Sequence, residues 1–247
     1  MKRAVVGFCG LAMLAAAMTA RPARADDAKA AIWDPLESVN RTIYSFNSAF
    51  GSSIATQIAT AYESAVPDSV RAGVDNVFTN LREPVTVVAA GLGGDLRNAG
   101  LSAGRFAINS TVGIGGVYDV ASGMGWVSRP TDLGTTLCRY NLPAGPYLVL
   151  PFIGPTTIRD TAGVLATYWA TFWLLDGWAP AYIIADRAVA YTTNRPATMP
   201  AAEAGDAYAE QRDHYQALRT GLCDGSIPGD RLKASPLGRV VEVAPHS

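Results

Sequence analysis

The stretch Gly145–Asp160, with the sequence GPYLVLPFIGPTTIRD, constrains the fold of this chain more than any other. Its prolines and glycines exclude a continuous helix, because proline lacks a backbone N–H and clashes with the preceding turn. Residues 147–153 are nevertheless apolar throughout and need cover. Exposed apolar surface is costly in water, and unpaired backbone groups are costly in lipid. The neighbouring chain must therefore supply walls around an irregular apolar segment.

A long apolar run follows this stretch. Thr156 or Thr157 can cap a helix with Asp160 in its first turn, and the run continues to Asp176. If residues 161–185 were one helix, they would span about 37 Å, enough for a hydrocarbon core of about 30 Å.

Interruptions near its middle argue against one continuous span. Asp176 and Gly177 lie there, Pro180 follows, and a charge near the bilayer centre costs about 2.5 to 3.5 kcal/mol. We therefore predict a half-depth helical hairpin, with arms at 162–175 and from 179 onward. Four aromatic side chains are expected to face the membrane: Trp169, Phe172, Trp173 and Trp178. The alternative is a soluble core helix rich in aromatic residues.

The first residues have the pattern of a secretory signal peptide. Lys2 and Arg3 precede an apolar stretch over 4–20, and Ala23-Arg24-Ala25 fits a cleavage site, which predicts a mature chain from Asp26. A retained anchor helix and a lipoprotein signal are the alternatives. For lipidation, Cys9 lies close to the basic start and follows Phe8, where a small residue is needed.

Cleavage would change the charge and the cysteine count. The full chain has 20 basic and 21 acidic residues, and loss of four basic residues leaves 16 and 21, a net charge of −5. Nucleic acid is therefore not an expected partner. Cys138 and Cys223 would remain in a compartment where a disulfide can form, and the alternative is two buried thiols. The roughly 220 mature residues are enough for one sizeable domain.

Two helices are predicted at the start of the mature chain. In the first, Asp34 can cap, Pro35 suits the first helical position and Glu37 can reach back to the cap. An apolar stripe then recurs at helical spacing and, taken alone, indicates an ordinary core-facing helix: Val39, Ile43, Phe46, Phe50, Ile54 and Ile58. A second helix is expected to begin at Pro67-Asp68 and to end at Glu83-Pro84.

A third helix should follow the turn Gly91–Asp95 and is rich in small residues, which allow close helix packing. It contains Gly100–Gly104, a formal match to the nucleophile elbow G-x-S-x-G. The elbow needs a strand before the serine, and a helix is predicted there instead. A Ser102/His214 lipid esterase is therefore only a remote alternative, and we predict no enzyme activity and no catalytic residues.

Two other site classes are not supported. Asn109–Gly116 (NSTVGIGG) resembles a phosphate loop but lacks the lysine that would meet the phosphate charge. His214 and His246 are the only histidines, and no carboxylate cluster accompanies them. We expect neither a metal nor a cofactor.

Motifs spread along the mature chain resemble the MlaA (VacJ) family. The resemblance extends into the C-terminal helix, where Tyr208, Arg212 and Tyr215 also fit. The residues that carry it are Asp34–Glu37, Asn40-Arg41, Phe46-Asn47, Leu81–Pro84, Arg105-Phe106, Asn109–Thr111, Gly113–Gly116, Tyr118-Asp119, Asp132–Gly134, Gly145–Tyr147, Leu150–Phe152, Gly154-Pro155 and Arg159-Asp160.

The resemblance implies an all-α, ring-shaped protein on the periplasmic side of a Gram-negative outer membrane. Such proteins surround an amphipathic channel for phospholipids leaving that membrane, which pass to a periplasmic carrier called MlaC; trimeric porins are further partners. The implied layout is a signal peptide (1–25), a linker (26–33), a helical domain (34–222) and a flexible tail (223–247). The alternative function is a structural, porin-associated factor that transports nothing.

Site residues follow from the same resemblance. A polar set is expected to line the channel or hold headgroups, with pairing inside the fold as the alternative: Arg41, Asn47, Arg105, Asn109, Asp119 and Arg159. Hinge or hairpin positions are expected at Asn141, Gly145, Pro146 and Gly154. The chain departs from the family in having no usable lipobox, and in having Asn141 and Pro143 where a glycine-rich loop is usual, which predicts a stiffer loop.

Overall fold

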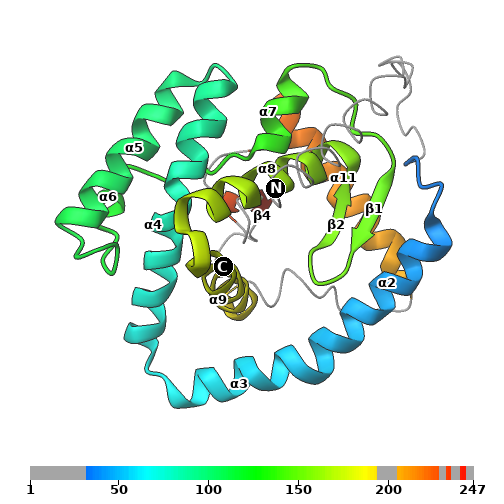
Figure 1. Ribbon diagram of the computed structural model, residues 1–247, viewed down its shortest axis with the longest axis horizontal. Helices are drawn as coiled ribbons and strands as arrows, with labels where there is room; N and C mark the ends of the chain where they lie inside the picture. The colour runs from blue at the N-terminus through cyan, green and yellow to red at the C-terminus, as the bar shows by residue number, and fades with distance from the viewer. Residues whose placement is uncertain (1–31, 194–204, 228–231, 235–239, 243–247) are drawn as a thin grey trace, which may run out of the picture.

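The computed structural model describes residues 32–193, 205–227, 232–234 and 240–242. The expected signal peptide and cleavage site lie outside these residues. Viewed as in Figure 1, the elements form a ring of helices into which a short β-hairpin is inserted. The first part of the ring consists of α2 (Glu37–Phe50), the π-helix η1 (Gly51–Ala55), α3 (Thr56–Ala65), α4 (Asp68–Leu92), α5 (Leu96–Thr111), α6 (Val120–Gly123) and α7 (Leu133–Arg139).

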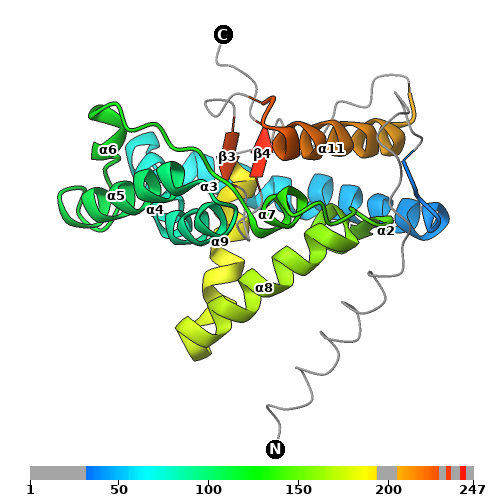
Figure 2. The ribbon, with the colours of Figure 1, turned by 90° about the horizontal axis from the view of Figure 1, so that it is seen from above.

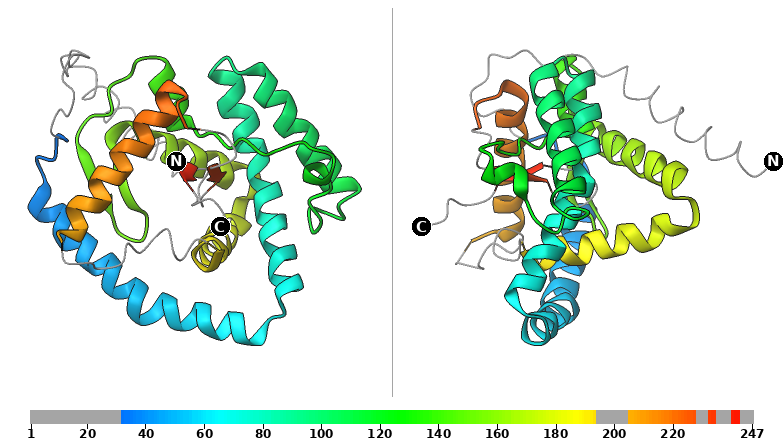
Figure 3. Two further views of the ribbon diagram at one scale, coloured as in Figure 1. Left: turned by 180° about the vertical axis from the view of Figure 1, so that it is seen from behind. Right: turned by 90° about the vertical axis from the view of Figure 1, so that its left-hand side faces the viewer.

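The remaining elements close the ring and leave its plane. They are β1 (Tyr147–Leu150), β2 (Gly154–Thr157), α8 (Ile158–Leu175), the 3-10 helix η2 (Asp176–Trp178), α9 (Ala179–Thr193), α11 (Ala207–Asp224), β3 (Leu232–Ala234) and β4 (Val240–Glu242). Figure 2 shows that α8 and α9 project from one side of the ring, while α11, β3 and β4 lie toward the other. The same V-shaped projection is visible in Figure 3.

The apolar stretch of 147–157 is more regular than its prolines suggest. β1 and β2 pair antiparallel, with Tyr147 opposite Thr157 and Leu150 opposite Gly154. Pro146 and Pro151 are tolerated because they flank β1, whereas Pro155 lies inside β2 opposite Val149. Gly154 takes the left-handed conformation, φ 86°, at the turn. Tyr147 and Val149 form the centre of a small core with Tyr208 and Tyr215 of α11. The hairpin is thus covered by α2 on one side and by α11 on the other.

Helix boundaries differ from expectation at two places. Helix α2 begins at Glu37, and Asp34 does not cap it, because the Asp34 carboxylate accepts hydrogen bonds from Asn40 (2.8 Å) and from the Tyr208 hydroxyl. Helix α4 continues through Pro84 to Leu92, so the predicted end at Glu83-Pro84 is wrong.

Pro84 deprives the Asn80 carbonyl of its helical donor. The residues before it are buried in ion pairs, Arg82 with Asp186 of α9 and Glu83 with Arg105 of α5. These tertiary contacts hold both halves of α4 in place, and tertiary contacts commonly override local propensity.

Other predicted boundaries are confirmed. Asp95 caps α5 by accepting from the Asn98 amide, and Thr157 caps α8 by accepting from the Asp160 amide. The apolar run breaks at Asp176, which has φ 46°, and α9 then returns toward the ring, so the helix–break–helix arrangement is confirmed. None of the helices within the described ranges is both long and apolar enough to cross a bilayer. At the C-terminus, α11 extends to Asp224 and β3 pairs with β4 inside the segment expected to be a flexible tail.

Candidate functional site

Polar side chains occupy the interface where a soluble helical hairpin would have its apolar core. On α5 these positions recur at helical spacing and are buried: Asn98, Ser102, Arg105 and Asn109. On α4 they face Asn80, Glu83 and Thr86, which are also buried. We call these seven residues the polar seam.

Arg105 lies at the centre of the polar seam and is 1% exposed. Its Nε donates to Glu83 Oε1 at 2.7 Å, and its Nη2 lies 3.2 Å from both carboxylate oxygens of Asp119. The guanidinium also donates to the Trp126 carbonyl and to Ser122 Oγ. A buried cation with this many acceptors is fully paired within the protein, so buried pairing, the second of the two predicted roles, describes Arg105.

Asn109 and Asp119 complete this network. Asn109 donates to Asp119 Oδ1 at 2.9 Å and accepts from the amide of Ala121 at 2.9 Å. Burial raises the pKa of Asp119, but hydrogen bonds from Ser122 and Asn109 and the charge of Arg105 outweigh it and hold that pKa below 3.8. The network ties α6 to α5, and the backbone amides of Gly113, Gly115 and Gly116 donate to carbonyls at the end of α5. The turn resembling a phosphate loop is therefore occupied by contacts within the chain.

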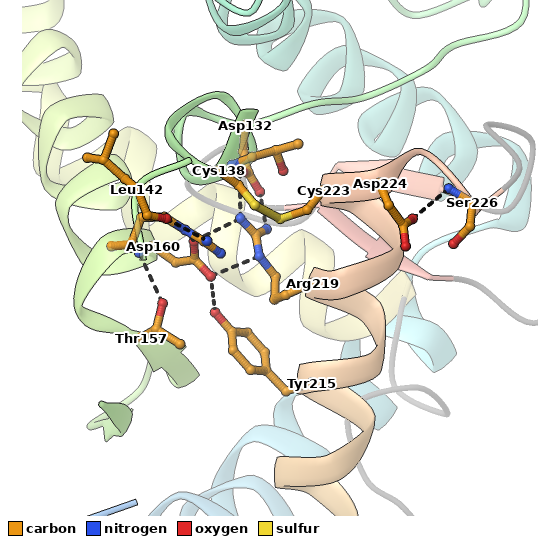
Figure 4. Close-up of a disulfide and its surroundings, with 12 residues drawn as sticks. Asp132, Cys138, Leu142, Thr157, Asp160, Tyr215, Arg219, Cys223, Asp224 and Ser226 are labelled. Carbon is orange, nitrogen blue, oxygen red and sulfur yellow. Dashed lines mark hydrogen bonds and ion pairs between the residues drawn. A yellow bond between two sulfur atoms is a disulfide. The ribbon is translucent and has the colours of Figure 1, made fainter. Parts of the chain in front are cut away.

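A second buried ionic cluster joins α7, α8 and α11 (Figure 4). Arg219 donates to Asp132 at 2.7 Å and to Asp160 at 3.0 Å, and Tyr215 donates to Asp160 at 2.5 Å. Arg159 pairs with its neighbour Asp160 at 3.0 Å and donates to the Leu142 carbonyl. All four ionic residues are buried.

A disulfide between Cys138 and Cys223 lies beside this cluster and confirms that the two cysteines pair. It joins the end of α7 to the end of α11. Close helix packing completes the joint, because a Cβ on Gly163 of α8 would lie 2.6 Å from the Gly134 amide of α7.

Two asparagines of α2 hold the β-hairpin edge. Asn40 is buried, donates to the Tyr147 carbonyl at 3.0 Å and accepts from the Val149 amide at 2.9 Å. Asn47 makes the equivalent pair of contacts at the turn of the hairpin. It donates to the Leu150 carbonyl (3.0 Å) and accepts from the Phe152 amide (2.9 Å). Both amides thus satisfy backbone groups that the strand edge would otherwise leave unpaired.

The turn held by Asn47 is strained and apolar. Phe152 has φ 60° and is exposed, and its ring makes edge contacts with Phe46 and Phe50. Arg187 of α9 donates to the Phe152 carbonyl. Of the predicted hinge positions, Asn141 has φ 59°, Gly145 φ 72° and Gly154 φ 86°, so all three adopt the left-handed conformation. Their hinge role stays a prediction.

Arg41 connects α2 to the start of α11. Its guanidinium makes a two-point contact with Asp206, at 2.8 and 2.5 Å, bonds Glu37 at 2.8 Å and lies 4.4 Å from the centre of the Tyr208 ring. This contact lowers the pKa of Asp206 to about 2.

The polar residues predicted as one set are distributed over separate places in the fold, and only Arg105, Asn109 and Asp119 lie together. A headgroup role for the more exposed ones, Arg41 and Asp119, stays a prediction.

Apolar side chains are exposed on the projecting hairpin. Trp173 is 79% exposed and Trp178 is 78% exposed, and both lie at the tip. We call the following set the apolar wedge: Leu165, Trp169, Phe172, Trp173, Leu174, Trp178 and Ile184. All four aromatic residues predicted to face a membrane belong to it. The adjoining Tyr182 is instead stacked on Phe78, and burial raises its pKa to about 12.

The apolar stripe of α2 and α3 is exposed as well. Val39, Phe46, Ile54 and Ile58 are each about half exposed or more, so the prediction of an ordinary core-facing helix is wrong for them. Polar Asn40, between two of these positions, is buried instead. Helices with polar interfaces and apolar exteriors are typical of a lipid environment.

Sequence analysis listed Glu83 and Asp132 only as motif residues and did not single out Arg219, although all three are buried and paired. A signal was available for the α5 side of the polar seam, because Asn98, Ser102, Arg105 and Asn109 recur with the spacing of a core stripe. Ser102 is wholly buried within α5, and the element before α5 is the helix α4, so the strand–serine–helix geometry of a nucleophile elbow is not formed. Helices α5 and α11, which would carry Ser102 and His214, lie at opposite sides of the molecule in Figures 1 and 2. Among the described residues, no group of histidine, cysteine and carboxylate side chains has a metal-binding arrangement.

Comparison with known proteins agrees with the motifs. Residues 32–221 match the family model described as MlaA lipoprotein. An uncharacterized protein of Rickettsia typhi is 34% identical over 77% of this chain and 75% of its own length. The Haemophilus influenzae protein named "Intermembrane phospholipid transport system lipoprotein MlaA" is 31% identical over 81% of this chain and 86% of its own length.

Other relatives match over a shorter segment. The Escherichia coli protein with that name is 39% identical over 54% of this chain, and the match spans about half, 55%, of that protein's length. The match to a Rickettsia prowazekii relative also spans 55% of the relative's length. A solved structure titled "Structural basis for maintenance of bacterial outer membrane lipid asymmetry" superposes with a TM-score of 0.68 at 28% identity, covering 77% of this chain and 98% of that one. The chain belongs to the MlaA lipoprotein family.

Proposed function

We propose that this chain is the outer-membrane component of an intermembrane phospholipid transport system. In this role it removes mislocalised phospholipid from the outer membrane and passes it to a periplasmic carrier, which maintains lipid asymmetry. The observation that carries the proposal is the apolar wedge, a continuous projection of exposed tryptophan, phenylalanine and leucine on one side of the ring. Such a surface is costly in water and favourable in lipid.

The polar seam supports the same environment. Buried asparagine and arginine hold α4 to α5, while Leu81, Val88, Leu92 and Leu96 are exposed on the outer faces of these helices. In lipid, packing of small residues and hydrogen bonds replace the hydrophobic effect as the force between helices. The names of the H. influenzae and E. coli relatives supply the transported class, phospholipid.

The two sides of the ring suggest where partners bind. The apolar wedge projects from one side, and α11 with its exposed Glu210, Asp213 and His214 lies on the other. With the wedge in lipid, α11 faces the periplasm, and we assign the MlaC-type carrier to that side. A trimeric porin is the proposed neighbour within the membrane.

A deletion strain tests this function. Loss of the protein should leave phospholipid in the outer leaflet and sensitise cells to detergent, and the wild-type chain should restore both properties. A clean deletion with normal surface lipid and normal detergent resistance would contradict the proposal. Restoration by a variant that cannot bind lipid would favour the structural, porin-associated role.

A further inference from the structure

Three arginines at one corner of the ring differ from the other arginines in the described residues. Arg97, Arg129 and Arg139 are exposed, and within the described ranges none of them forms an ion pair or donates a side-chain hydrogen bond. Elsewhere in those ranges arginine side chains reach a carboxylate or a backbone carbonyl, even at the surface, where Arg71 pairs with Asp68. Unpaired guanidinium groups are free to meet an anion.

The fold brings these three residues to the turn between α4 and α5. Arg97 is in the first turn of α5, and Asn98 beside it donates to the Arg129 carbonyl at 2.9 Å. Arg139 ends α7 and lies over Gly93, where a Cβ would be 3.5 Å from its Cδ and its Nη1. We call the three side chains the arginine corner. The one carboxylate in this turn, Asp95, already accepts from the Asn98 amide as the cap of α5.

Exposed apolar side chains adjoin two residues of the arginine corner, Arg97 and Arg139, along the chain. Leu96 is 75% exposed, and Leu92, Tyr140 and Leu142 are also exposed. Tyr140 is held in place by donating to the Leu92 carbonyl at 2.7 Å. A free anion would need only the guanidinium groups. Arginine, tyrosine and leucine together are typical of a membrane interface, where the charged group meets the headgroup and the apolar group meets the acyl chain.

We propose that the arginine corner binds the phosphate of a membrane phospholipid headgroup, with the acyl chains of that lipid against Leu92 and Leu96. Arginine suits this ligand because its planar donors match phosphate oxygens at two points. The inference rests on the proposed function only in placing the ring in a membrane. It adds a lipid site outside both buried networks and apart from the apolar wedge.

Lipid binding by the purified full-length protein in detergent tests the site. Thermophoresis measures the affinity for dioleoylphosphatidylglycerol, for dioleoylglycerol, which lacks phosphate, and for inorganic phosphate. A basic residue near an anionic surface contributes about fivefold, so R97Q/R129Q/R139Q should bind phosphatidylglycerol on the order of 100-fold more weakly than wild type. R71Q, in the same helix hairpin but at an arginine that is already paired, should bind as wild type does.

The outcomes separate the sources of the anion. Weak binding of dioleoylglycerol and of inorganic phosphate, with tight binding of phosphatidylglycerol, supports a lipid headgroup site. If inorganic phosphate bound as tightly as phosphatidylglycerol, the arginine corner would be a free-anion site and not a lipid site. If R97Q/R129Q/R139Q bound phosphatidylglycerol as tightly as wild type, the proposed site would be ruled out. The triple lysine variant should bind more tightly than R97Q/R129Q/R139Q and more weakly than wild type, because it keeps the charge but loses the two-point donor geometry. Restoration of a deletion strain by wild type is scored separately, so failure of the corner is distinct from failure of the proposed function.

Discussion

At the scale of single residues, this protein places its charges inside and many of its large apolar side chains outside. Arg82, Arg105 and Arg219 are each at most 4% exposed, whereas Trp173 and Trp178 are almost fully exposed. Each buried arginine among the described residues is paired with a carboxylate, as burial of a charge requires. Breaking one of these pairs should cost more than removing a surface pair.

Replacing Arg105 by leucine tests this directly. The change leaves Glu83 and Asp119 without their cation, so R105L should lower the free energy of unfolding by about 3 to 5 kcal/mol in urea titrations. The matched control R71L removes a partly exposed pair with Asp68 and should cost about 1 kcal/mol or less. A stable R105L protein that has lost transport would instead support a channel role for Arg105.

The pH dependence of stability provides a second test at this scale. Asp119 has a lowered pKa in the folded protein, so its stabilisation is present above the unfolded value of 3.8 and is lost as pH falls through the folded value. The difference in unfolding free energy between wild type and D119N should be constant above about pH 5 and shrink in more acidic solution. Asp206, whose pKa is also lowered, is present in both proteins, so its contribution to the pH dependence cancels in the difference. A difference that does not change with pH would contradict the assignment.

At the scale of elements, the wedge and the C-terminal helix have separate tasks. The hairpin of α8 and α9 exposes apolar side chains, while α11 closes the ring through a disulfide and an ionic cluster. Substitutions can change the exposed side chains of the hairpin without altering the disulfide and ion pairs of α11, and the reverse.

Charging the wedge should release the protein from lipid. W173E/W178E places two carboxylates at the tip of the hairpin, and retention on phospholipid vesicles should fall strongly, because each charge costs a few kcal/mol at membrane depth. The control A217E adds a charge to the exposed face of α11 and should leave retention unchanged.

Fractionation of a C9S variant separates membrane retention by the hairpin from retention by a lipid anchor. Carbonate-resistant retention supports the hairpin, and release to the soluble periplasm would show that a lipid on Cys9 was the anchor.

Reduction of the disulfide should destabilise the joint between α7 and α11. The bridge closes a loop across a sequence separation of 85, for which loop-closure entropy predicts about 4 to 5 kcal/mol. Unfolding of wild type should move to lower urea concentration in the presence of reductant, whereas C138S/C223S should be insensitive to it. Identical wild-type curves with and without reductant would contradict a stabilising role.

Local signals predicted the helices well and the polarity of their faces poorly. Caps at Asp95 and Thr157 and the break at Asp176 depend on neighbouring residues, and the sequence shows them. The passage of α4 through Pro84 depends on Arg105 and Asp186, which are distant in sequence, so the local rule failed. The stripe of α2 has the same period whether it faces a core or lipid, and only the structure shows that Phe46 and Ile58 are exposed.

At the scale of the whole molecule, the hairpin that carries the apolar wedge projects from one side of the ring and α11 lies toward the other. The family motifs predicted the ring, because they are distributed along residues 34–160 and into α11. They did not predict how the polar residues divide between two buried networks, since partners such as Asp132 and Arg219 are far apart in the chain. This division pairs the buried charges within the chain and leaves the large apolar side chains of the wedge exposed.

Transfer of phospholipid by the purified protein tests the central claim most directly. Protein reconstituted in vesicles with a fluorescent phospholipid is mixed with a soluble MlaC-type carrier, and lipid on the carrier is measured after the vesicles are removed. Wild-type protein should transfer lipid, W173E/W178E should transfer little, and gently purified wild-type protein should carry bound phospholipid. Folded wild-type protein that carries no phospholipid and transfers none above protein-free vesicles would contradict it.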